Sequence, residues 1–381
     1  MKYPIAQPVL NGNERKYLID AFDSTWISSQ GKYIAEVEEK FATFCGVEVA
    51  LTCFNGTVAL HLALLAIDLQ PGDEVIIPAV TYIATANAVE YMGGKPVFVD
   101  IRPDTLNIDE NAIEKSITNK TKAIIVVHIY GHPCEMDTIM AIAGKHNILV
   151  IEDAAEAHGA IYYSNIDGKK VAKQVGSIGD LGTFSFFANK IITSGEGGMV
   201  TTNNPKYAET IRLLKDQGMS TEKRYWFPVI GYNYRMTNLQ AAILLGQLEK
   251  VEWHLAQRRR IAERYITNLK DNPLIVIPPE LENVKSSYWM FTMVLSGRIA
   301  HRRDEVMAEL RNRGVDSRPI FYPLPEMPPY FEENHKVSYP ISFESSYAGF
   351  NLPSSNYLTN EDIDFICGEV NDVVRQVENF S

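Results

Sequence analysis

The chain has 381 residues, of which 46% are hydrophobic and 22% charged, a composition that excludes a disordered or fibrous protein and predicts a globular one with two domains. Its formal net charge of −11 argues against nucleic acid or an anionic membrane as the main partner, because either requires a basic surface. No apolar run could span a bilayer, residues 1–18 lack the apolar core of a signal peptide, and the four cysteines have no zinc-site spacing, so we expect a cytoplasmic protein with reduced thiols and no metal.

Strand and helix patterns alternate through the first 215 residues. Strands are expected at 50–54, 73–79, 95–101, 121–131, 179–187 and 197–203, with a further strand at 148–159 that runs into a loop. Helices are expected at 56–69, 81–93 and 135–147. Short β-branched runs alternating with helices predict an α/β fold with a mixed, mostly parallel sheet flanked by helices.

After residue 240 the pattern changes. Residues 238–270 have one continuous helical pattern, which a proline-containing stretch ends. A strand at 287–295, a helix at 302–314, a loop at 315–333 and a helix at 358–380 follow. We therefore expect a large domain over residues 1–245 and a smaller C-terminal α/β domain over 246–381. The basic run Arg258–Arg260 is interpreted as a solvated helix face.

Three stretches of the first domain could carry chemistry. The first is the turn "NGT" at residues 55–57, where a strand ends and a helix opens. Free N–H groups at a helix start favour an anion, and Gly56 would let it approach. The alternative is an ordinary capped turn without a ligand. The stretch is neither a Walker loop nor a dinucleotide-binding fingerprint.

The second stretch places Asp153 at the end of an apolar strand, where open α/β sheets bind ligands. A carboxylate in such apolar surroundings needs a cationic partner. That partner could be an arginine, a helix N-terminus or a protonated ring nitrogen of a cofactor. Glu156 and His158 follow on the same loop.

The third stretch, "TFSFFANKIITSGEGGMV" (183–200), sets Lys190 among aromatic and aliphatic residues, before three glycines. If the fold desolvates this lysine, its pKa falls and its amine becomes nucleophilic enough to form a Schiff base. A surface lysine is the alternative. The glycines indicate a tight turn or a close approach of the backbone.

Together, the three stretches meet the needs of pyridoxal phosphate (PLP). Its phosphate would take the helix start, its ring nitrogen the carboxylate of Asp153 and its aldehyde the amine of Lys190. Tyr82, at a predicted helix start, could stack on the ring face or be a half-buried aromatic without that role.

The motifs "NGTVALHLAL", "GDEVIIPAVTYIATANAV", "YGHPCEMD", "VIEDAAEAHGA", "FSFFANKIITSGEGGMV" and "GYNYRMTNLQAA" resemble the DegT/DnrJ/EryC1/StrS family of sugar aminotransferases. The resemblance is collinear over nearly the whole chain. It implies the aspartate-aminotransferase fold (PLP fold type I) with a smaller C-terminal domain. It also implies a homodimer with shared active sites, because Asn233 matches an asparagine that reaches the phosphate from the neighbouring subunit.

By matching positions, the resemblance implies roles in the site. Lys190 would form the internal aldimine with PLP, and pyridoxamine phosphate would arise in turnover. Asp153 would pair with the pyridine nitrogen. Glu156, where many members have glutamine, would lie near the ring hydroxyl. The remaining cofactor contacts implied are Gly56, Thr57 and Ser185 at the phosphate and Tyr82 on the ring.

The reaction implied by the resemblance moves an amino group from an amino acid, usually L-glutamate, to C4 of a nucleotide-linked 4-keto-6-deoxy sugar. GDP-4-keto-6-deoxy-D-mannose is the leading substrate, and a UDP- or dTDP-linked 4-keto-6-deoxyglucose is the alternative. A non-catalytic PLP-fold sensor is disfavoured by the presence of Lys190 and by the acidic net charge.

The residues that would choose the sugar are less defined. Substrate contacts are expected from Trp26, Ser28, Ser29 and Arg318, and Lys223 and Arg224 could add positive charge for the diphosphate. The chain departs from relatives at Pro325 and Glu326, where they often have a histidine. A sugar contact made by that histidine is therefore open here.

Overall fold

A seven-stranded sheet forms the centre of the molecule in the computed structural model, which describes residues 2–379. Its strands stand in the order β1-β9-β8-β5-β4-β2-β3, and every neighbouring pair is parallel except the two pairs that β9 makes. The prediction of a mixed, mostly parallel sheet is confirmed. The strands are β1 (Val49–Cys53), β2 (Glu74–Pro78), β3 (Lys95–Val99), β4 (Thr121–Val127), β5 (Leu149–Asp153), β8 (Leu181–Ser185) and β9 (Gly198–Thr202).

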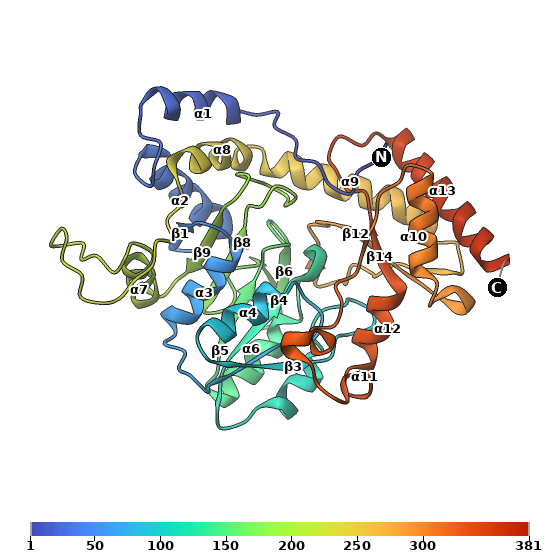
Figure 1. The fold of residues 1–381 in the computed structure, drawn as a ribbon, viewed down its shortest axis with the longest axis horizontal. Helices are drawn as coiled ribbons and strands as arrows, with labels where there is room; N and C mark the ends of the chain where they lie inside the picture. Colours follow the sequence, from blue (N-terminus) through green and yellow to red (C-terminus); the bar gives the residue numbers. More distant parts are fainter. Residues whose placement is uncertain (1, 380–381) are drawn as a thin grey trace.

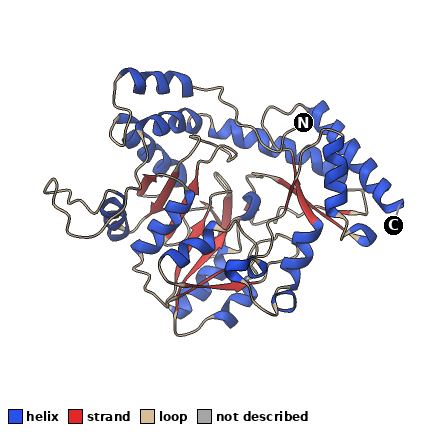
Figure 2. Cartoon of the chain, viewed as in Figure 1, coloured by secondary structure: helices blue, strands red, loops and turns tan. Residues whose placement is uncertain are grey.

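Helices cover both faces of this sheet (Figures 1 and 2). Because side chains alternate along a strand, Val75 and Ile77 of β2 enter the core shared with α3 and α4, whereas Ile76 enters the core shared with α6. The helices that precede or cover the sheet are α1 (Glu14–Asp23), α2 (Lys32–Cys45), α3 (Gly56–Ala66), α4 (Ala84–Tyr91), α5 (Glu110–Ile113), α6 (Met136–His146), α7 (Pro205–Lys215) and α8 (Asn238–Leu248).

A second core surrounds an antiparallel sheet of order β10-β12-β14-β13, to the right of the first in Figure 1. Helix α13 supplies an apolar stripe that packs on α9 and α10. The domain boundary at residue 245 stays a prediction. The elements are β10 (Ile275–Val276), β12 (Phe291–Leu295), β13 (Arg318–Pro319), β14 (Gly349–Leu352), α9 (Val251–Leu269), α10 (Arg303–Asn312), α11 (His335–Ser338), α12 (Pro340–Ala348) and α13 (Asn360–Asn379).

Two elements differ from the sequence expectation. The helical pattern over 238–270 is two helices, because Lys250 leaves helical geometry at φ −110° and ψ 8° between α8 and α9. Helix α8 is buried on nearly every side by α1 and α2, whereas α9 turns its apolar stripe toward α13. The strands β6 (Ile161–Ile166), β7 (Lys169–Gln174) and β11 (Val284–Lys285) form a separate sheet that the sequence reading did not expect.

The interpretation of Arg258–Arg260 as a solvated face is wrong for its first member. Arg258 is 4% exposed, and its guanidinium donates to the backbone carbonyls of Trp289 and Ser354. It ties α9 to the segments that flank β12 and β14. Within residues 2–379, no helix combines the length and apolar character needed to cross a membrane.

Candidate active site

A pocket of about 370 Å³ opens where the carboxyl ends of β1, β2, β5 and β8 meet. Such strand ends are the usual ligand site of an open α/β sheet, and the volume suits a small cofactor or substrate. The pocket brings together seven of the residues singled out in the sequence, namely Gly56, Thr57, Tyr82, Asp153, Glu156, Ser185 and Lys190.

One end of the pocket is the N-terminus of α3. Asn55 caps this helix, because its side chain accepts a hydrogen bond from the Val58 N–H at 3.0 Å. A Cβ on Gly56 would lie 2.7 Å from the Ser185 Cβ, and one on Gly198 would lie 2.3 Å from the Asn55 carbonyl oxygen. These two glycines therefore let the helix start pack directly on β8 and β9. The result is a turn of free N–H groups beside a serine hydroxyl, which suits a phosphate.

Gly56→Ala is expected to lower the free energy of unfolding by about 1–3 kcal/mol, because the new methyl group overlaps Ser185 and forces the helix start away from β8. It should also weaken binding of an anion at this end of the pocket. Thermal unfolding and cofactor titration measure both effects. Gly144→Ala is the matched control, since a Cβ there meets nothing within 4 Å in helix α6. That control should leave stability unchanged or raise it.

Asp153 lies on the floor of the pocket at the end of β5. The residue is 6% exposed, and its carboxylate accepts hydrogen bonds from the Thr85 hydroxyl at 2.9 Å and the Ala155 N–H at 3.2 Å. Burial raises the pKa of this carboxyl, although those two donors partly offset the rise. These are the two hydrogen bonds that the carboxylate accepts among residues 2–379, and because both donors are neutral, the carboxylate is suited to a cationic ligand group.

Lys190 points into the same pocket, with its side chain 12% exposed. Its Nζ lies 3.8 Å from Glu156 Oε1, which is an ion-pair distance longer than a hydrogen bond. The amine also lies 3.9 Å from the centre of the Trp289 ring. Desolvation lowers the pKa of Lys190, while the charges of Glu156 and Asp153 oppose that fall. The structure therefore favours the desolvated lysine over the surface lysine.

The loop that follows Asp153 adds two more unusual groups. Burial raises the pKa of Glu156 to about 7, although Lys190 opposes the rise. Burial also lowers the pKa of His158 to about 3, and no side chain among residues 2–379 forms a hydrogen bond with either of its ring nitrogens. Perturbed titrating groups of this kind cluster at functional sites.

Several pocket residues carry no signal in the sequence. Trp289 and Phe321 come from segments beside the second core, and they line the pocket with Tyr82. The Tyr82 ring is 60% exposed and lies 5.9 Å from that of Phe321. Thr85 could have been found, because it lies at the start of a helix that follows a strand end, and its hydroxyl meets Asp153.

The predicted substrate residues lie outside this pocket in the single chain. Trp26 borders a separate surface hollow that also involves Lys32 and Asn238. Ser28 and Ser29 are close by in the chain, and the Ser28 carbonyl accepts the Asn238 N–H. Arg318 is 57% exposed at its side chain and pairs with Asp316 at 2.6 Å. All four roles stay predictions.

Two further positions from the sequence reading also lie apart. Glu326 accepts a hydrogen bond from the Tyr347 hydroxyl at 2.7 Å and does not line the pocket. Asn233 is exposed and lies in the segment between α7 and α8, where it bridges to Asp216. Its expected phosphate contact would therefore have to be made in another copy of the chain.

Comparison with known proteins finds one family of aminotransferases. The sequence profile of the DegT/DnrJ/EryC1/StrS aminotransferase family matches residues 8–371. A Caulobacter vibrioides protein named GDP-perosamine synthase is 48% identical over 374 residues, covering 97% of this chain and 98% of that protein. An Escherichia coli O157:H7 protein of the same name is 46% identical over 373 residues, covering 98% and 99% of the two chains.

Solved structures similar to this chain include one described as a sugar aminotransferase. A Streptococcus pneumoniae protein was solved in a PLP form and a PMP form. The PLP form matches with a TM-score of 0.92 and 28% identity, covering 99% of this chain and 100% of that one. The PMP form matches with a TM-score of 0.93 and 27% identity, covering 100% and 99%.

Proposed function

The chain belongs to the DegT/DnrJ/EryC1/StrS aminotransferase family, and we propose that it transfers an amino group from L-glutamate to C4 of GDP-4-keto-6-deoxy-D-mannose, yielding GDP-perosamine. The sugar part of this proposal rests on the two relatives that carry the name GDP-perosamine synthase and are 46% and 48% identical to the chain. The chain is a PLP-dependent aminotransferase, as its family and its solved neighbours are.

One observation carries the chemistry. The amine of Lys190, whose side chain is 12% exposed, shares a cavity with the buried carboxylate of Asp153 and with the N-terminus of α3. An amine, an acid and an anion-binding turn are the three groups that a pyridine aldehyde phosphate needs at its three ends. They come from three segments more than 30 residues apart in the chain, and the sheet brings their strand ends to one edge.

The residues present fit PLP. Gly56, Thr57 and Ser185 would hold the phosphate at the helix start, and Asp153, whose carboxylate accepts hydrogen bonds from two neutral donors, would hold the ring nitrogen. Tyr82 would cover the ring, and Glu156 lies on the Lys190 side of the cavity. When bound, the cofactor supplies a protonated ring that withdraws electrons from the carbon next to the transferred amine.

The chain's own residues then divide the work. Asp153, once ionised, would favour a proton on the ring nitrogen by its charge. Burial lowers the pKa of Lys190, which favours the neutral amine that would accept a proton at Nζ and return it. The rings of Trp289 and Phe321 wall the cavity beside that amine and exclude water from it.

The proposal is tested by offering the purified protein a panel of 4-keto-6-deoxy sugars linked to GDP, UDP and dTDP, with L-glutamate as donor. We expect the GDP-mannose derivative to give the highest kcat/KM and 2-oxoglutarate to form in equal amount. Faster turnover of a UDP- or dTDP-linked sugar would replace the GDP assignment while leaving the aminotransferase intact.

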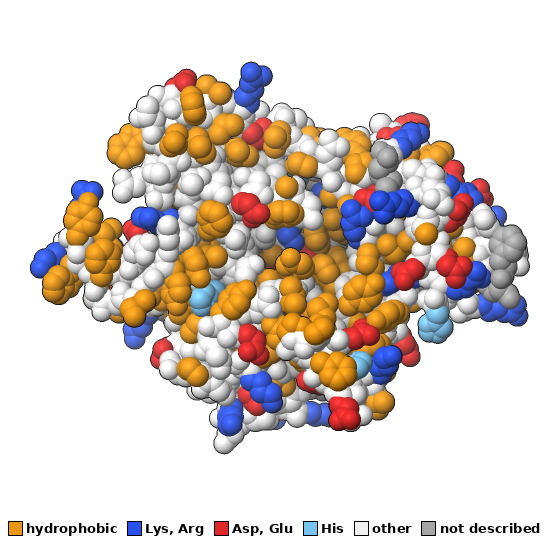
Figure 3. All heavy atoms as spheres, viewed as in Figure 1, with side chains coloured by type: hydrophobic (Ala, Val, Ile, Leu, Met, Phe, Trp, Pro, Cys, Tyr) orange, Lys and Arg blue, Asp and Glu red, His pale blue; other side chains and the backbone are white. Residues whose placement is uncertain are grey.

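We further propose that the enzyme is a homodimer with shared active sites. The support is the segment between α7 and α8, which projects from the molecule (Figures 1 and 3) and exposes five apolar side chains in close succession, Tyr225, Trp226, Phe227, Val229 and Ile230. Ile230 alone is 92% exposed. An exposed apolar cluster of this kind is typical of a surface that a partner covers, and Asn233 lies three residues beyond it.

Ile230→Asp is expected to weaken dimerisation by at least about tenfold, because a carboxylate would have to be buried without a partner at the interface. Multi-angle light scattering over a dilution series measures the effect. Ile166→Asp is the control, since Ile166 is 43% exposed on β6, outside the segment. A wild-type chain that is monomeric at micromolar concentration would refute the dimer proposal.

We place the enzyme in the cytoplasm. The four cysteines are free and buried, and none is paired in the part of the chain that the structure describes. Unpaired thiols persist in the reducing conditions of that compartment.

A further inference from the structure

Tyr130 holds an unusual backbone conformation next to the active site. It stands at φ 52° and ψ 16° in the turn after β4, in the left-handed region that aromatic residues rarely adopt. Its N–H donates to Glu156 Oε2 at 2.9 Å, and Glu156 Oε1 is the oxygen that faces Lys190. A residue stays in such a conformation only when its surroundings impose it.

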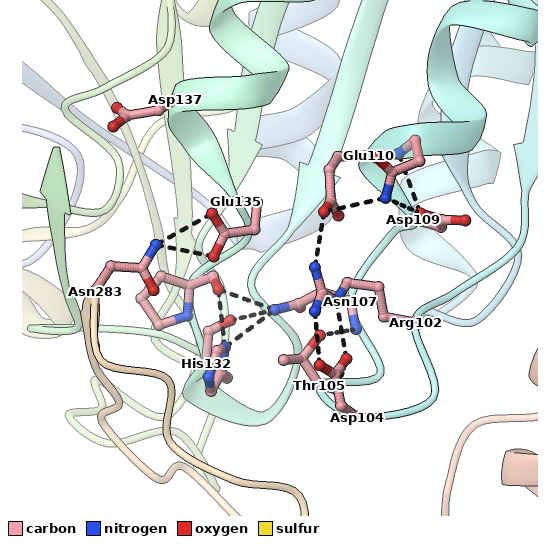
Figure 4. A network of polar contacts seen from close by, with 12 residues as sticks. Arg102, Asp104, Thr105, Asn107, Asp109, Glu110, His132, Glu135, Asp137 and Asn283 are labelled. Carbon is pink, nitrogen blue, oxygen red and sulfur yellow. Dashed lines mark hydrogen bonds and ion pairs between the residues drawn. The ribbon is translucent and has the colours of Figure 1, made fainter. Parts of the chain in front are cut away.

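The polar clamp on this turn is Asn107. Its Oδ1 accepts the Ile129 N–H at 3.1 Å, and its Nδ2 donates to the carbonyls of His132 and Pro133, each at 3.0 Å. One side chain therefore binds the turn both before and after Tyr130. Figure 4 shows the Asn107 amide directed at His132. Asn107 is 2% exposed and does not line the pocket.

Asn107 is itself fixed by a braced loop (Figure 4). Its carbonyl accepts the Arg102 N–H at 2.8 Å. The Arg102 guanidinium pairs with Asp104 at 2.6 Å and with Glu110 at 2.7 Å. The loop between β3 and α5 thus presents the Asn107 amide in one position.

We propose that Asn107 is a positioning residue of the active site, which clamps the turn at residues 129–133 and so holds the Tyr130 N–H on the Glu156 carboxylate that faces Lys190. The bond from Tyr130 is the one backbone hydrogen bond that Glu156 accepts among residues 2–379. A hydrogen bond to a carboxylate favours its charged form. The clamp therefore maintains negative charge beside the lysine amine.

The charged and titratable groups around Lys190 and Glu156 determine how the clamp can affect the pKa of Lys190. Lys190 is faced by the carboxylates of Glu156 and Asp153, by His158 and by the Trp289 ring. Glu156 is faced by Lys190, Asp153 and Tyr130. Burial lowers the pKa of Lys190, and the Glu156 charge is the largest opposing influence. Loss of the Tyr130 bond makes Glu156 harder to ionise, and the pKa of Lys190 should fall further.

The test uses the full-length chain freed of cofactor, so its result does not depend on the proposed reaction. The catalytic value of a positioned Lys190 amine does rest on the proposed function. Acetic anhydride labels neutral amines, and peptide mass spectrometry gives the extent of Lys190 acetylation at each pH. In Asn107→Ala, we expect the pH at which Lys190 acetylation is half-maximal to fall by about half a pH unit or more. Below the midpoints of both proteins, this means about threefold more neutral amine in the variant than in the wild type. Asn107→Ser should move the midpoint in the same direction and replaces Asn107→Ala if that variant does not fold.

Two further proteins make the test specific. Asn283→Ala is the matched control, because Asn283 donates to both Glu135 oxygens in the same network (Figure 4) but does not touch the turn. It should leave the midpoint unchanged. Glu156→Gln should lower the midpoint, and adding Asn107→Ala to it should produce no further shift, since Asn107 acts through Glu156.

An unchanged midpoint in the folded Asn107 variant would overturn the proposal. So would an equal, additive shift in the Glu156→Gln background, or the same shift in Asn283→Ala. The ketosugar panel is scored separately. A clamp confirmed by acetylation beside an inactive enzyme would therefore count against the proposed substrate and not against Asn107.

Discussion

Lys190→Ala is expected to lower the rate of transamination by about 10³-fold or more, because it removes the amine that we propose binds the cofactor and moves the proton. The yellow colour that glutamate bleaches in the wild-type protein should also be lost. Stopped-flow absorbance with glutamate alone measures both effects, before any sugar is added.

Lys215→Ala is the matched control for this experiment. Lys215 is equally enclosed, with a side chain 14% exposed and paired with Glu38 at 3.1 Å, but it does not line the pocket. It should lose stability and keep the rate per folded molecule. A Lys190→Ala protein that transaminates at the wild-type rate would overturn the mechanism.

Asp153→Asn is expected to lower kcat/KM by about 10²–10³-fold, because it removes the charge that we propose keeps the ring nitrogen of the cofactor protonated. The Thr85 hydroxyl can still donate to the amide oxygen, so the geometry of the floor is preserved. Binding of cofactor should weaken in the same variant, as measured by equilibrium titration.

Stability separates this effect from damage to the fold. Burial raises the pKa of Asp153 in the folded chain, so its ionised form opposes folding at pH values above its ordinary pKa. In the cofactor-free protein at neutral pH, Asp153→Asn should therefore unfold at the same or a higher temperature. Asp180→Asn, at the opposite end of β5 where Asp180 accepts the Val150 N–H, should keep activity and lose stability. An active Asp153→Asn enzyme would contradict the assigned role.

The meeting of Gly56, Asp153 and Lys190 in one pocket could be predicted from the sequence because the signals for it are local. Asp153 follows an apolar strand, Gly56 opens a helix after a strand, and Lys190 stands among residues that belong in a core. Parallel strands carry such positions to one edge of a sheet, so three local patterns became one site. The seven-stranded sheet was predictable for the same reason.

The aromatic wall of the pocket, formed by Trp289 and Phe321, was not predictable from the sequence. Trp289 and Phe321 reach the pocket because a second sheet packs beside the first, and no local pattern encodes that docking. Arg258 was misinterpreted for a related reason. Its charge predicts exposure, yet two backbone carbonyls of distant segments satisfy it in the interior.

The clamp by Asn107 likewise depends on tertiary structure. Left-handed geometry at a tyrosine has no signal in the sequence, and the residues that impose it lie more than 20 positions away. The position of Lys190 is therefore encoded locally, whereas the charge that faces it depends on contacts between distant loops.

We propose that the Lys190 amine holds the cofactor through a covalent imine bond. Borohydride reduction of the purified, PLP-loaded protein converts the imine between lysine and cofactor into a stable amine. Peptide mass mapping then locates the added pyridoxyl phosphate. We expect one modified peptide, with the added mass on Lys190. Modification of any other lysine in its place, or of none in protein that has bound PLP, would contradict it.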